Sequence, residues 1–300
     1  MNKTTGGIIT IVFVMFIWGS SFTVTKMVVT EAPPLISAAI RNIIACLVLL
    51  PFYLSRRRKV QQALPYPKLA LMGIVGTTVY YLFFNTGMKY IAASTGALIE
   101  GLVPVAIAVP AALILKEQLN KRIIAGILLS VTGVILVGFV GSAQKSPNAL
   151  LGSTMIVGAV CLWSTYTLLS RSLKNMDTTL VTTVSMFIGT VLSIPLAFIE
   201  ISNSGWPDIS LKAWLGIIYL GVFASAVAYF LYNRALESLP AAQVGNFLNL
   251  VPVIGAVIAF IFLKDTFTWL QLAGGILVLA GIWLSSQQTQ PQVSRKKKIQ

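Results

Sequence analysis

The most constraining feature of this sequence is a series of long apolar stretches separated by very short polar breaks. A helix needs about 20 apolar residues to cross the roughly 30 Å hydrocarbon layer of a bilayer. The stretches do not alternate at period two, which excludes an outer-membrane barrel. Because backbone groups in lipid must be satisfied within the chain, we expect an all-α polytopic membrane protein with ten transmembrane helices. The predicted segments are 8–29, 35–54, 69–90, 93–115, 122–140, 151–171, 180–199, 212–237, 241–263 and 269–286.

The composition agrees with a lipid-embedded chain and narrows its chemistry. Hydrophobic residues make up 56% of the chain and charged residues only 10%, whereas a soluble domain carries about 25% charged residues. Histidine is absent, and Cys46 and Cys161 both lie inside apolar stretches without metal-ligand spacing. We therefore expect no disulfide framework, no metal and no cofactor.

Basic residues set the expected orientation in the membrane. Most of the 22 Lys and Arg residues fall in alternate loops, on the side that also holds both chain ends. The positive-inside rule places these loops and both termini in the cytoplasm, with the chain in the cytoplasmic membrane. This topology accounts for the net charge of +14 without a nucleic-acid partner. Residues 287–300 form a basic tail that either fixes topology or binds anionic membrane lipids.

An internal repeat divides the chain into two similar halves. The later part of each half matches at a shift of 148 residues and the earlier part at a shift of about 145. The matched residues are Tyr81 and Tyr229, Asn85 and Asn233, Glu117 and Asp265, Trp18 and Trp163, and Lys26 and Arg171. Five helices per repeat is an odd number, so the second copy enters from the opposite face. The predicted units are a first repeat at 1–146, an inverted second repeat at 147–286 and the tail at 287–300.

Inverted repeats indicate a secondary transporter, because one sequence pattern can adopt two exchanging conformations around a midplane site. We expect a small-molecule substrate, no catalytic residues and no ATP, since the chain has no P-loop. Two alternatives stay open at this stage. A multipass membrane enzyme would need clustered His, Asp or Glu at a membrane face, and a non-transporting scaffold would need an appended domain or a long loop.

Several motifs resemble the EamA-type branch of the drug/metabolite transporter superfamily. They are Trp18-Gly19-Ser20 with Lys26, Pro33-Pro34 with Arg41, and Pro104 with Lys116-Glu117, and the likeness runs over residues 8–286. The resemblance implies a cavity lined by the first, third and fourth helices of each repeat. It also implies transport of amino acids, other metabolites or drugs, with export favoured. Glu100 and Asp265 depart from the pattern, which usually has an apolar residue and a glutamate there.

Three ionisable residues inside the apolar stretches are candidates for coupling or gating, because a charge in a membrane helix needs a partner or water. Glu100 either binds a cationic group of the substrate, takes up a proton, or forms a static pair with Arg41 or Lys26. Arg41 either holds a substrate carboxylate or clamps two helices. Lys26 either gates the path or extends its amine toward the interface.

A second set of candidates comes from polar and aromatic residues. Thr77, Tyr81 and Asn85 recur at i, i+4 and i+8, and the shift of 148 carries them to Ser225, Tyr229 and Asn233. Each triplet shares one helix face, which predicts either opposite walls of a path or hydrogen bonds between helices. The remaining cavity candidates are Trp18, Ser21, Trp163, Tyr166, Asn246 and Asn249. Pro104 and Pro252 are predicted to kink their helices, and Gly274-Gly275 is expected to form a packing seam in a monomer or homodimer.

Overall fold

The computed structural model describes residues 3–60, 62–91, 96, 99–117, 119–139, 148–251, 253–255, 258 and 269–286, and all its regular structure within these ranges is helical. The first half contains α1 (Lys3–Glu31), α2 (Pro34–Lys59), α3 (Tyr66–Gly73), η1 (Ile74–Thr78), α4 (Val79–Tyr90), α6 (Val103–Ile114) and α7 (Lys121–Phe139). The second half contains α8 (Ala149–Ser172), α9 (Thr178–Ser204), α10 (Leu211–Tyr219), η2 (Leu220–Val227), α11 (Ala228–Ser238), α12 (Ala241–Phe247) and α14 (Trp269–Ser286).

Six helical spans among the described residues are long and apolar enough to cross a membrane. They are Thr4–Glu31, Pro34–Lys59, Tyr66–Tyr90, Ala149–Ser172, Thr178–Ser204 and Leu211–Ser238. Two shorter apolar helices, Val103–Ile114 and Leu272–Ser285, add to these. The all-helical, multi-pass prediction is therefore confirmed, while the count of ten spans stays a prediction.

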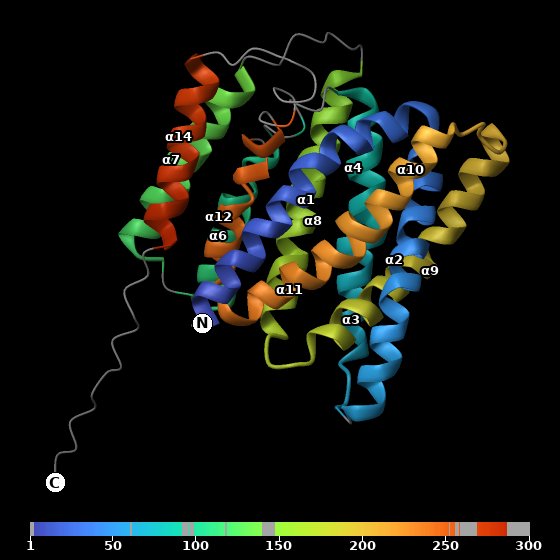
Figure 1. The fold of residues 1–300 in the computed structure, drawn as a ribbon, viewed down its shortest axis with the longest axis horizontal. Coiled ribbons are helices and arrows are strands. Elements are labelled where there is room, and N and C mark those ends of the chain that lie inside the picture. Colours follow the sequence, from blue (N-terminus) through green and yellow to red (C-terminus); the bar gives the residue numbers. More distant parts are fainter. Residues whose placement is uncertain are drawn as a thin grey trace.

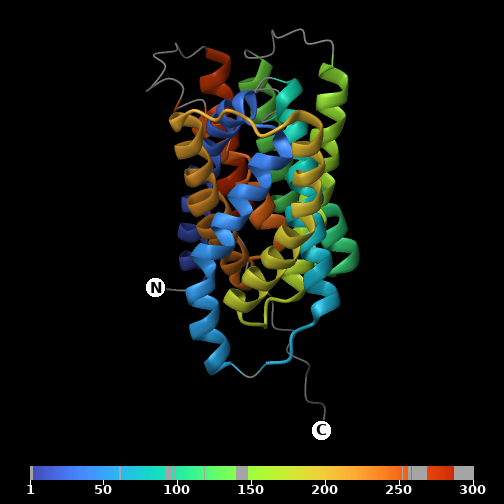
Figure 2. The ribbon, with the colours of Figure 1, turned by 90° about the vertical axis from the view of Figure 1, so that its right-hand side faces the viewer.

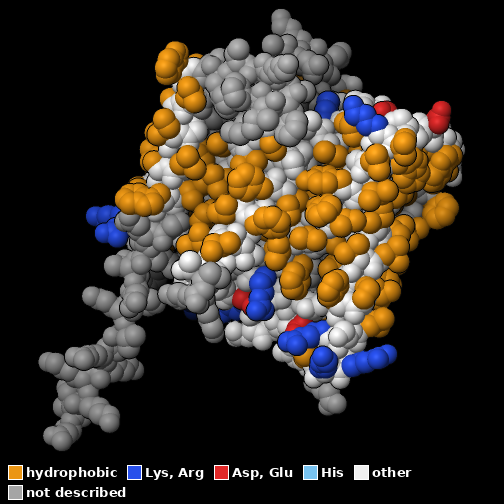
Figure 3. Space-filling model, in the orientation of Figure 1, with side chains coloured by type: hydrophobic (Ala, Val, Ile, Leu, Met, Phe, Trp, Pro, Cys, Tyr) orange, Lys and Arg blue, Asp and Glu red, His pale blue; other side chains and the backbone are white. Residues whose placement is uncertain are grey.

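The surface matches a chain surrounded by lipid. Figure 3 shows hydrophobic side chains across the middle of one face, with Lys, Arg, Asp and Glu toward its two ends. Large apolar side chains such as Phe13, Leu113 and Trp283 are more than half exposed, which would be costly in water but is favourable in hydrocarbon.

The helices run between two ends of the bundle (Figures 1 and 2). The N-terminal end holds the start of α1 and the connections at 60–65 and 173–177. The far end holds the connections at 32–33 and 205–210. Local chemistry starts several helices at these connections. Pro34 occupies the first turn of α2, where its missing N–H is harmless. Asp177 accepts from the amides of Thr179 and Leu180 at the start of α9, as an N-cap does.

The third helical span of each half has a feature that the sequence analysis did not predict. Each is interrupted by a π-helical segment, η1 in the α3–α4 span and η2 in the α10–α11 span. The shift of 148 residues carries η1 into η2. Short π-helical turns are rare and frequently lie at functional sites. The matched position therefore draws attention to the middle of these two helices.

Helices α7 and α14 pack side by side through a glycine seam (Figure 1). A Cβ atom on Gly126 would lie 2.5 Å from the carbonyl oxygen of Gly281, and one on Gly133 would lie 2.5 Å from that of Gly274. The two backbones thus touch at both points. Gly126 and Gly274 are repeat mates, and so are Gly133 and Gly281, so one sequence pattern supplies both sides of the seam. Its place agrees with the expected packing role of Gly274.

The predicted segment 93–115 is not one continuous helix in its described part. Residues 101–102 form a turn, and α6 begins at Val103 with Pro104 in its first turn. A proline there removes no intrahelical hydrogen bond. Pro104 therefore starts a helix instead of kinking one. Pro252, its mate, lies outside the described residues.

Candidate functional site

A cavity lies in the middle of the bundle, between the two halves of the chain. Its walls come from α1, α2, α4, α6, α8 and α11 and from residues just after α12. The lining residues are Trp18, Ser21, Phe22, Thr25, Arg41, Tyr80, Tyr81, Phe84, Glu100, Val103, Trp163, Tyr229, Leu248 and Val251. The space open to a water-sized molecule is about 40 Å³, which corresponds to roughly three waters. An organic solute would need side chains to move before it could enter.

The cavity extends from the middle of the bundle toward the far end. Along α1 the lining runs from Trp18 to Thr25, in the direction of Glu31. Along α4 it runs from Tyr80 to Phe84, in the direction of Tyr90. Both directions lead away from the N-terminal end, so the cavity lies asymmetrically between the two ends of the bundle.

Aromatic rings form the floor of the cavity. The indole of Trp163 lies 5.2 Å from the ring of Trp18, 5.2 Å from that of Tyr229 and 5.0 Å from that of Tyr166, measured between centroids. Tyr232 packs against both tryptophans at 5.2 Å. Such edge-to-face and offset contacts are favourable arrangements for aromatic rings. They bring together Trp18, Trp163 and Tyr166, which the sequence singled out.

Arg41 forms part of the cavity wall, and its positive charge has no carboxylate partner among the described residues. Its side chain is 4% exposed, its Nε donates to the Ser225 hydroxyl at 3.1 Å, and its guanidinium carbon lies 4.3 Å from the centroid of the Tyr81 ring. A buried guanidinium has five N–H donors, and only one has a side-chain partner here. Arg41 is therefore free to bind an anionic group.

Glu100 is the acidic member of the cavity lining. Its Oε1 accepts from the Tyr80 hydroxyl at 3.4 Å, and it forms no ion pair in the described part of the chain. The static pair with Arg41 or Lys26 is thus not present. Lys26 instead donates to the carbonyls of Met88 and Ile91, both at 2.8 Å, and so clamps α1 to the end of α4 away from the cavity lining.

A polar network seals the bundle on the N-terminal side of the aromatic floor. The Asn233 amide donates to the Tyr166 hydroxyl at 2.7 Å and the Thr182 hydroxyl at 2.9 Å. Its oxygen accepts from the Ser170 hydroxyl at 2.7 Å. These groups come from α8, α9 and α11 and are all buried. This network, the seal, links three helices through buried hydrogen bonds.

The repeat mate of Asn233 is held more loosely. Asn85 donates to the carbonyl of Pro34 at 3.1 Å and reaches the Ser37 hydroxyl at 3.5 Å, while its side-chain oxygen has no partner. Ser21 and Thr25, the mates of Tyr166 and Ser170, line the cavity instead of closing on Asn85. Residues at the same repeat positions therefore form a hydrogen-bonded network in the second half and line the cavity in the first.

Several predicted lining residues face other helices. A Cβ on Gly189 of α9 would lie 2.6 Å from Cβ of Thr77, so Thr77 packs against α9. Asn246 donates to Ser285 of α14 at 2.7 Å. Asn249 is buried, and its side-chain amide has no hydrogen-bond partner among the described residues. Thr77, Asn85 and Asn246 therefore act as contacts between helices in this structure.

Other lining residues were missed by the sequence interpretation. They are Phe22, Thr25, Tyr80, Phe84, Val103, Leu248 and Val251. The i, i+4, i+8 pattern assumed a regular α-helix, but η1 widens the turn that precedes α4. A π-helical turn shifts the faces of the residues that follow. The sequence signal that could have identified Tyr80 as a lining residue was its place next to Tyr81. Regular α-helical spacing does not single out Tyr80.

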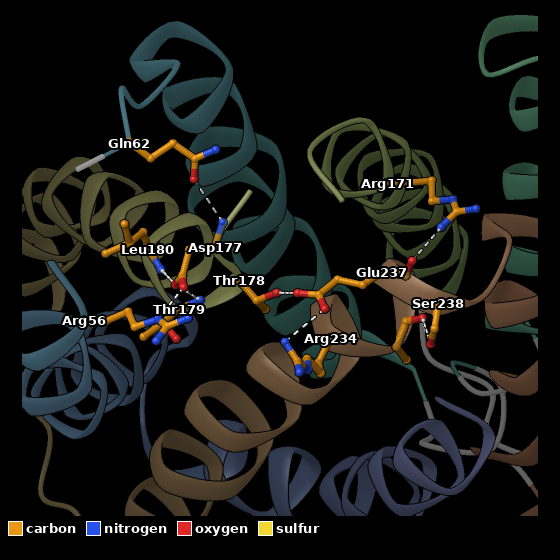
Figure 4. Close-up of polar contacts among 11 residues, drawn as sticks. Arg56, Gln62, Arg171, Asp177, Thr178, Thr179, Leu180, Arg234, Glu237 and Ser238 are labelled. Atoms are coloured by element: carbon orange, nitrogen blue, oxygen red, sulfur yellow. Dashed lines mark hydrogen bonds and ion pairs between the residues drawn. The ribbon is translucent and has the colours of Figure 1, made fainter. Parts of the chain in front are cut away.

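Ionic contacts gather at the N-terminal end of the bundle, where Figure 4 draws Arg56 with Asp177 and Arg234 with Glu237. Arg56 Nε lies 2.5 Å from Asp177 Oδ2, and Arg171 Nε lies 3.0 Å from Glu117 Oε1. Glu237 pairs with Arg234 at 3.0 Å and accepts from Thr178. Partial burial by itself raises the pKa of Asp177, but the hydrogen bonds from Arg56 and from the Leu180 and Thr179 amides outweigh it, so this pKa is lowered overall.

Comparison with known proteins adds independent information. The sequence profile of the EamA-like transporter family matches residues 5–139 and again residues 150–287. The uncharacterized transporter YyaM of Bacillus subtilis is 31% identical over 279 residues, covering 89% of each chain. The uncharacterized transporter YetK of the same organism is 24% identical, covering 95% of this chain and 88% of its own.

Two further comparisons bear on fold and chemistry. A probable terminal-alkyne amino-acid exporter of Streptantibioticus cattleyicolor is 27% identical over 224 residues, covering 74% of each chain. One solved crystal structure matches with a TM-score of 0.76 at 21% identity, covering 92% of this chain and 94% of that chain. That likeness shows a shared fold.

Proposed function

The chain belongs to the EamA-like transporter family, and we propose that it is a secondary transporter that exports a small organic solute across the cytoplasmic membrane by alternating access. The observation that carries this proposal is the central cavity. It lies between the two halves, its lining reaches from the middle of the bundle toward the far end, and the buried Asn233 network lies on its other side. Secondary transporters with inverted repeats bind substrate at such a place.

The positive-inside rule relates the two ends of the bundle to the two sides of the membrane. Arg56, Arg57 and Arg58 at the end of α2 lie near the N-terminal end, which the rule assigns to the cytoplasm. The far end is then external, and the structure corresponds to a state that faces outward. Export requires a second state in which the same floor is reached from the cytoplasm.

The cavity lining supports a zwitterionic solute with an apolar or aromatic body, such as an amino acid. Arg41 offers unpaired N–H donors that suit a carboxylate, and Glu100 offers an acceptor for an ammonium group. The floor of Trp18 and Trp163 suits an apolar side chain and can also hold a cation over its rings. The relative described as a probable amino-acid exporter is in keeping with this choice.

Counterflow in proteoliposomes tests the proposal. Purified protein is reconstituted with a panel of aromatic amino acids, aliphatic amino acids, simple amines and cationic dyes on the inside, and uptake of labelled solute is followed. We expect exchange of an amino acid without ATP and little exchange of amines that lack a carboxylate. Liposomes that move none of the panel would contradict the function, and preferential exchange of dyes or amines would contradict the substrate class.

Glu100→Gln separates two roles of that carboxylate, with Glu31→Gln as the matched control. Glu31 lies at the far end and accepts from the Ser210 amide, outside the cavity lining. If Glu100 couples transport to protons, Glu100→Gln abolishes the pH dependence of transport while exchange persists. If Glu100 only binds the ammonium group, the variant raises KM at every pH. Unchanged transport and pH dependence would remove Glu100 from the site.

A further inference from the structure

Two backbone carbonyls in the π-helical segments accept hydrogen bonds from side chains of the opposite half. The Tyr229 hydroxyl donates to the carbonyl of Gly76 in η1 at 2.7 Å. The Trp18 indole N–H donates to the carbonyl of Ala224 in η2 at 3.0 Å. Gly76 and Ala224 are 148 residues apart, so they are the same acceptor in the two repeats.

The donors differ although both halves contain both types. Trp163 is the mate of Trp18, and Tyr81 is the mate of Tyr229. A symmetric arrangement would give both carbonyls the same kind of donor. Instead the first-half carbonyl has a tyrosine and the second-half carbonyl has a tryptophan.

The two other donors lie beside the residues that make these bonds, and the Trp163 ring contacts Tyr229, which donates to Gly76. The Trp163 side chain is 5% exposed. Its Nε1 has no partner of good hydrogen-bond geometry, and its one polar neighbour among the described residues is the Tyr232 hydroxyl. The Tyr81 hydroxyl lies 3.4 Å from the hydroxyl of Ser225, the residue that follows Ala224. A buried indole N–H without a well-aligned partner is costly and needs an explanation. An exchange of donors supplies one.

We propose that Tyr229, Trp18, Tyr81 and Trp163 are positioning residues that exchange on these two carbonyls as the cavity changes sides. In the present state the Tyr229 hydroxyl donates to the Gly76 carbonyl, and the Trp18 indole donates to the Ala224 carbonyl. In the state open to the N-terminal end, the Trp163 indole donates to the Gly76 carbonyl, and the Tyr81 hydroxyl donates to the Ala224 carbonyl. This inference rests on the proposed alternating-access function.

The exchange would couple directly to access, because the four donors meet at the cavity floor. Trp18, Trp163 and Tyr229 are in mutual ring contact, and these rings separate the open half from the sealed half. Each state makes one tyrosine and one tryptophan bond and leaves one indole N–H without a well-aligned partner. The two states therefore keep the same number of these bonds, which keeps them close in free energy, so that substrate binding can shift their populations.

Accessibility of two matched cysteines reports the two states. The background carries Cys46→Ser and Cys161→Ser, which remove the native thiols. Thr25→Cys reports the far end, because Thr25 lines the cavity. In a separate chain Ser170→Cys reports the N-terminal end, because its repeat mate is Thr25 and it is buried in the seal. Labelling rates with a small water-borne thiol reagent are measured on purified protein in detergent, where both ends are reachable.

Two variants that each remove one hydroxyl should act in opposite directions. Tyr229→Phe removes a bond of the present state, so labelling at Ser170→Cys should rise relative to Thr25→Cys. Tyr81→Phe removes a bond of the other state, so the ratio should fall. Loss of one hydrogen bond corresponds to a change of about fivefold in each direction. Tyr66→Phe is the control, because Tyr66 is exposed at the start of α3, and its ratio should not change.

The outcomes separate the two proposals. If the labelling ratio responds to substrate but Tyr229→Phe and Tyr81→Phe shift it in the same direction, or not at all, the donor exchange is refuted and alternating access stands. If no substrate in the panel and no variant ever exposes Ser170→Cys, both proposals fall. If Tyr229→Phe does not yield folded protein, Tyr81→Phe and Trp163→Phe decide alone, because both must lower the ratio.

Discussion

Adding methyl groups to the glycine seam between α7 and α14 should destabilise the bundle by an amount that the structure sets. In Gly126→Ala the new Cβ would start 2.5 Å from the carbonyl oxygen of Gly281, whereas ordinary contact begins at 3.4 Å. The two backbones would have to separate by about 0.9 Å. Backbone cannot move aside as a side-chain tip can, and overpacking of this kind costs about 1–3 kcal/mol per site.

Part of that cost is returned by helix propensity, since alanine is better than glycine inside a helix by about 1 kcal/mol. Gly126→Ala together with Gly133→Ala doubles both effects, because Gly133 meets Gly274 at the same distance. The net loss is about 2 kcal/mol for the pair if each site costs the middle of the overpacking range. For a chain of 300 residues it lowers the unfolding temperature by about 3 °C.

Gly275→Ala is the matched control on α14. A Cβ there meets Val253 at 3.7 Å, an ordinary contact, so the propensity gain is expected without the clash. Unfolding of each purified variant is followed in one detergent by tryptophan fluorescence during heating. The reasoning is refuted if the Gly126→Ala, Gly133→Ala protein melts at or above the temperature of Gly275→Ala.

Three further outcomes are expected. Arg41→Lys keeps the charge but loses the planar pair of donors, so the KM for an amino acid should rise about tenfold or more, and an unchanged KM in counterflow would exclude a carboxylate bound there. Asn233→Ala removes three buried hydrogen bonds, and Asn85→Ala removes one hydrogen bond of good length. At about 0.6 kcal/mol per bond, Asn233→Ala should lower the unfolding free energy in SDS titrations by about three times as much as Asn85→Ala. Equal losses would argue against the seal. Asp177 has a lowered pKa from its Arg56 partner and the α9 amides, set against partial burial, so its contribution is fully present above the unfolded value of about 3.9 and is lost as pH falls through the lower folded value. Asp177→Asn should therefore melt below the parent at pH 7, and the gap should narrow as the pH is lowered below about 3.9; a gap that does not narrow would contradict this.

Much of the site could be named from the sequence because charge and aromaticity are exceptional inside apolar stretches. Trp18, Arg41, Glu100 and Trp163 stood out for this reason, and all four line the cavity. Thr77 was chosen by helical periodicity and Asn246 as a polar residue of the ninth apolar stretch, and they contact α9 and α14 instead. Periodicity shows that residues share a face but leaves open which neighbour that face meets.

The sequence by itself determined that the chain is helical and lies in lipid, because continuous apolar stretches leave the backbone no other way to satisfy its polar groups. It also determined the internal repeat, through residues such as Tyr81 and Tyr229 that recur at a fixed shift. Both follow from local composition and spacing.

Only the tertiary structure decided where the π-helical turns fall and which end of the bundle is closed. Asn85 and Asn233 are the same residue in the same repeat position, yet one is fully bonded and the other is not. Under the proposed alternating access, two similar halves would allow two arrangements of nearly equal free energy, and the repeat pattern by itself does not choose between them. That choice comes from long-range contacts, such as Tyr229 with Gly76, which exist only once the helices have packed.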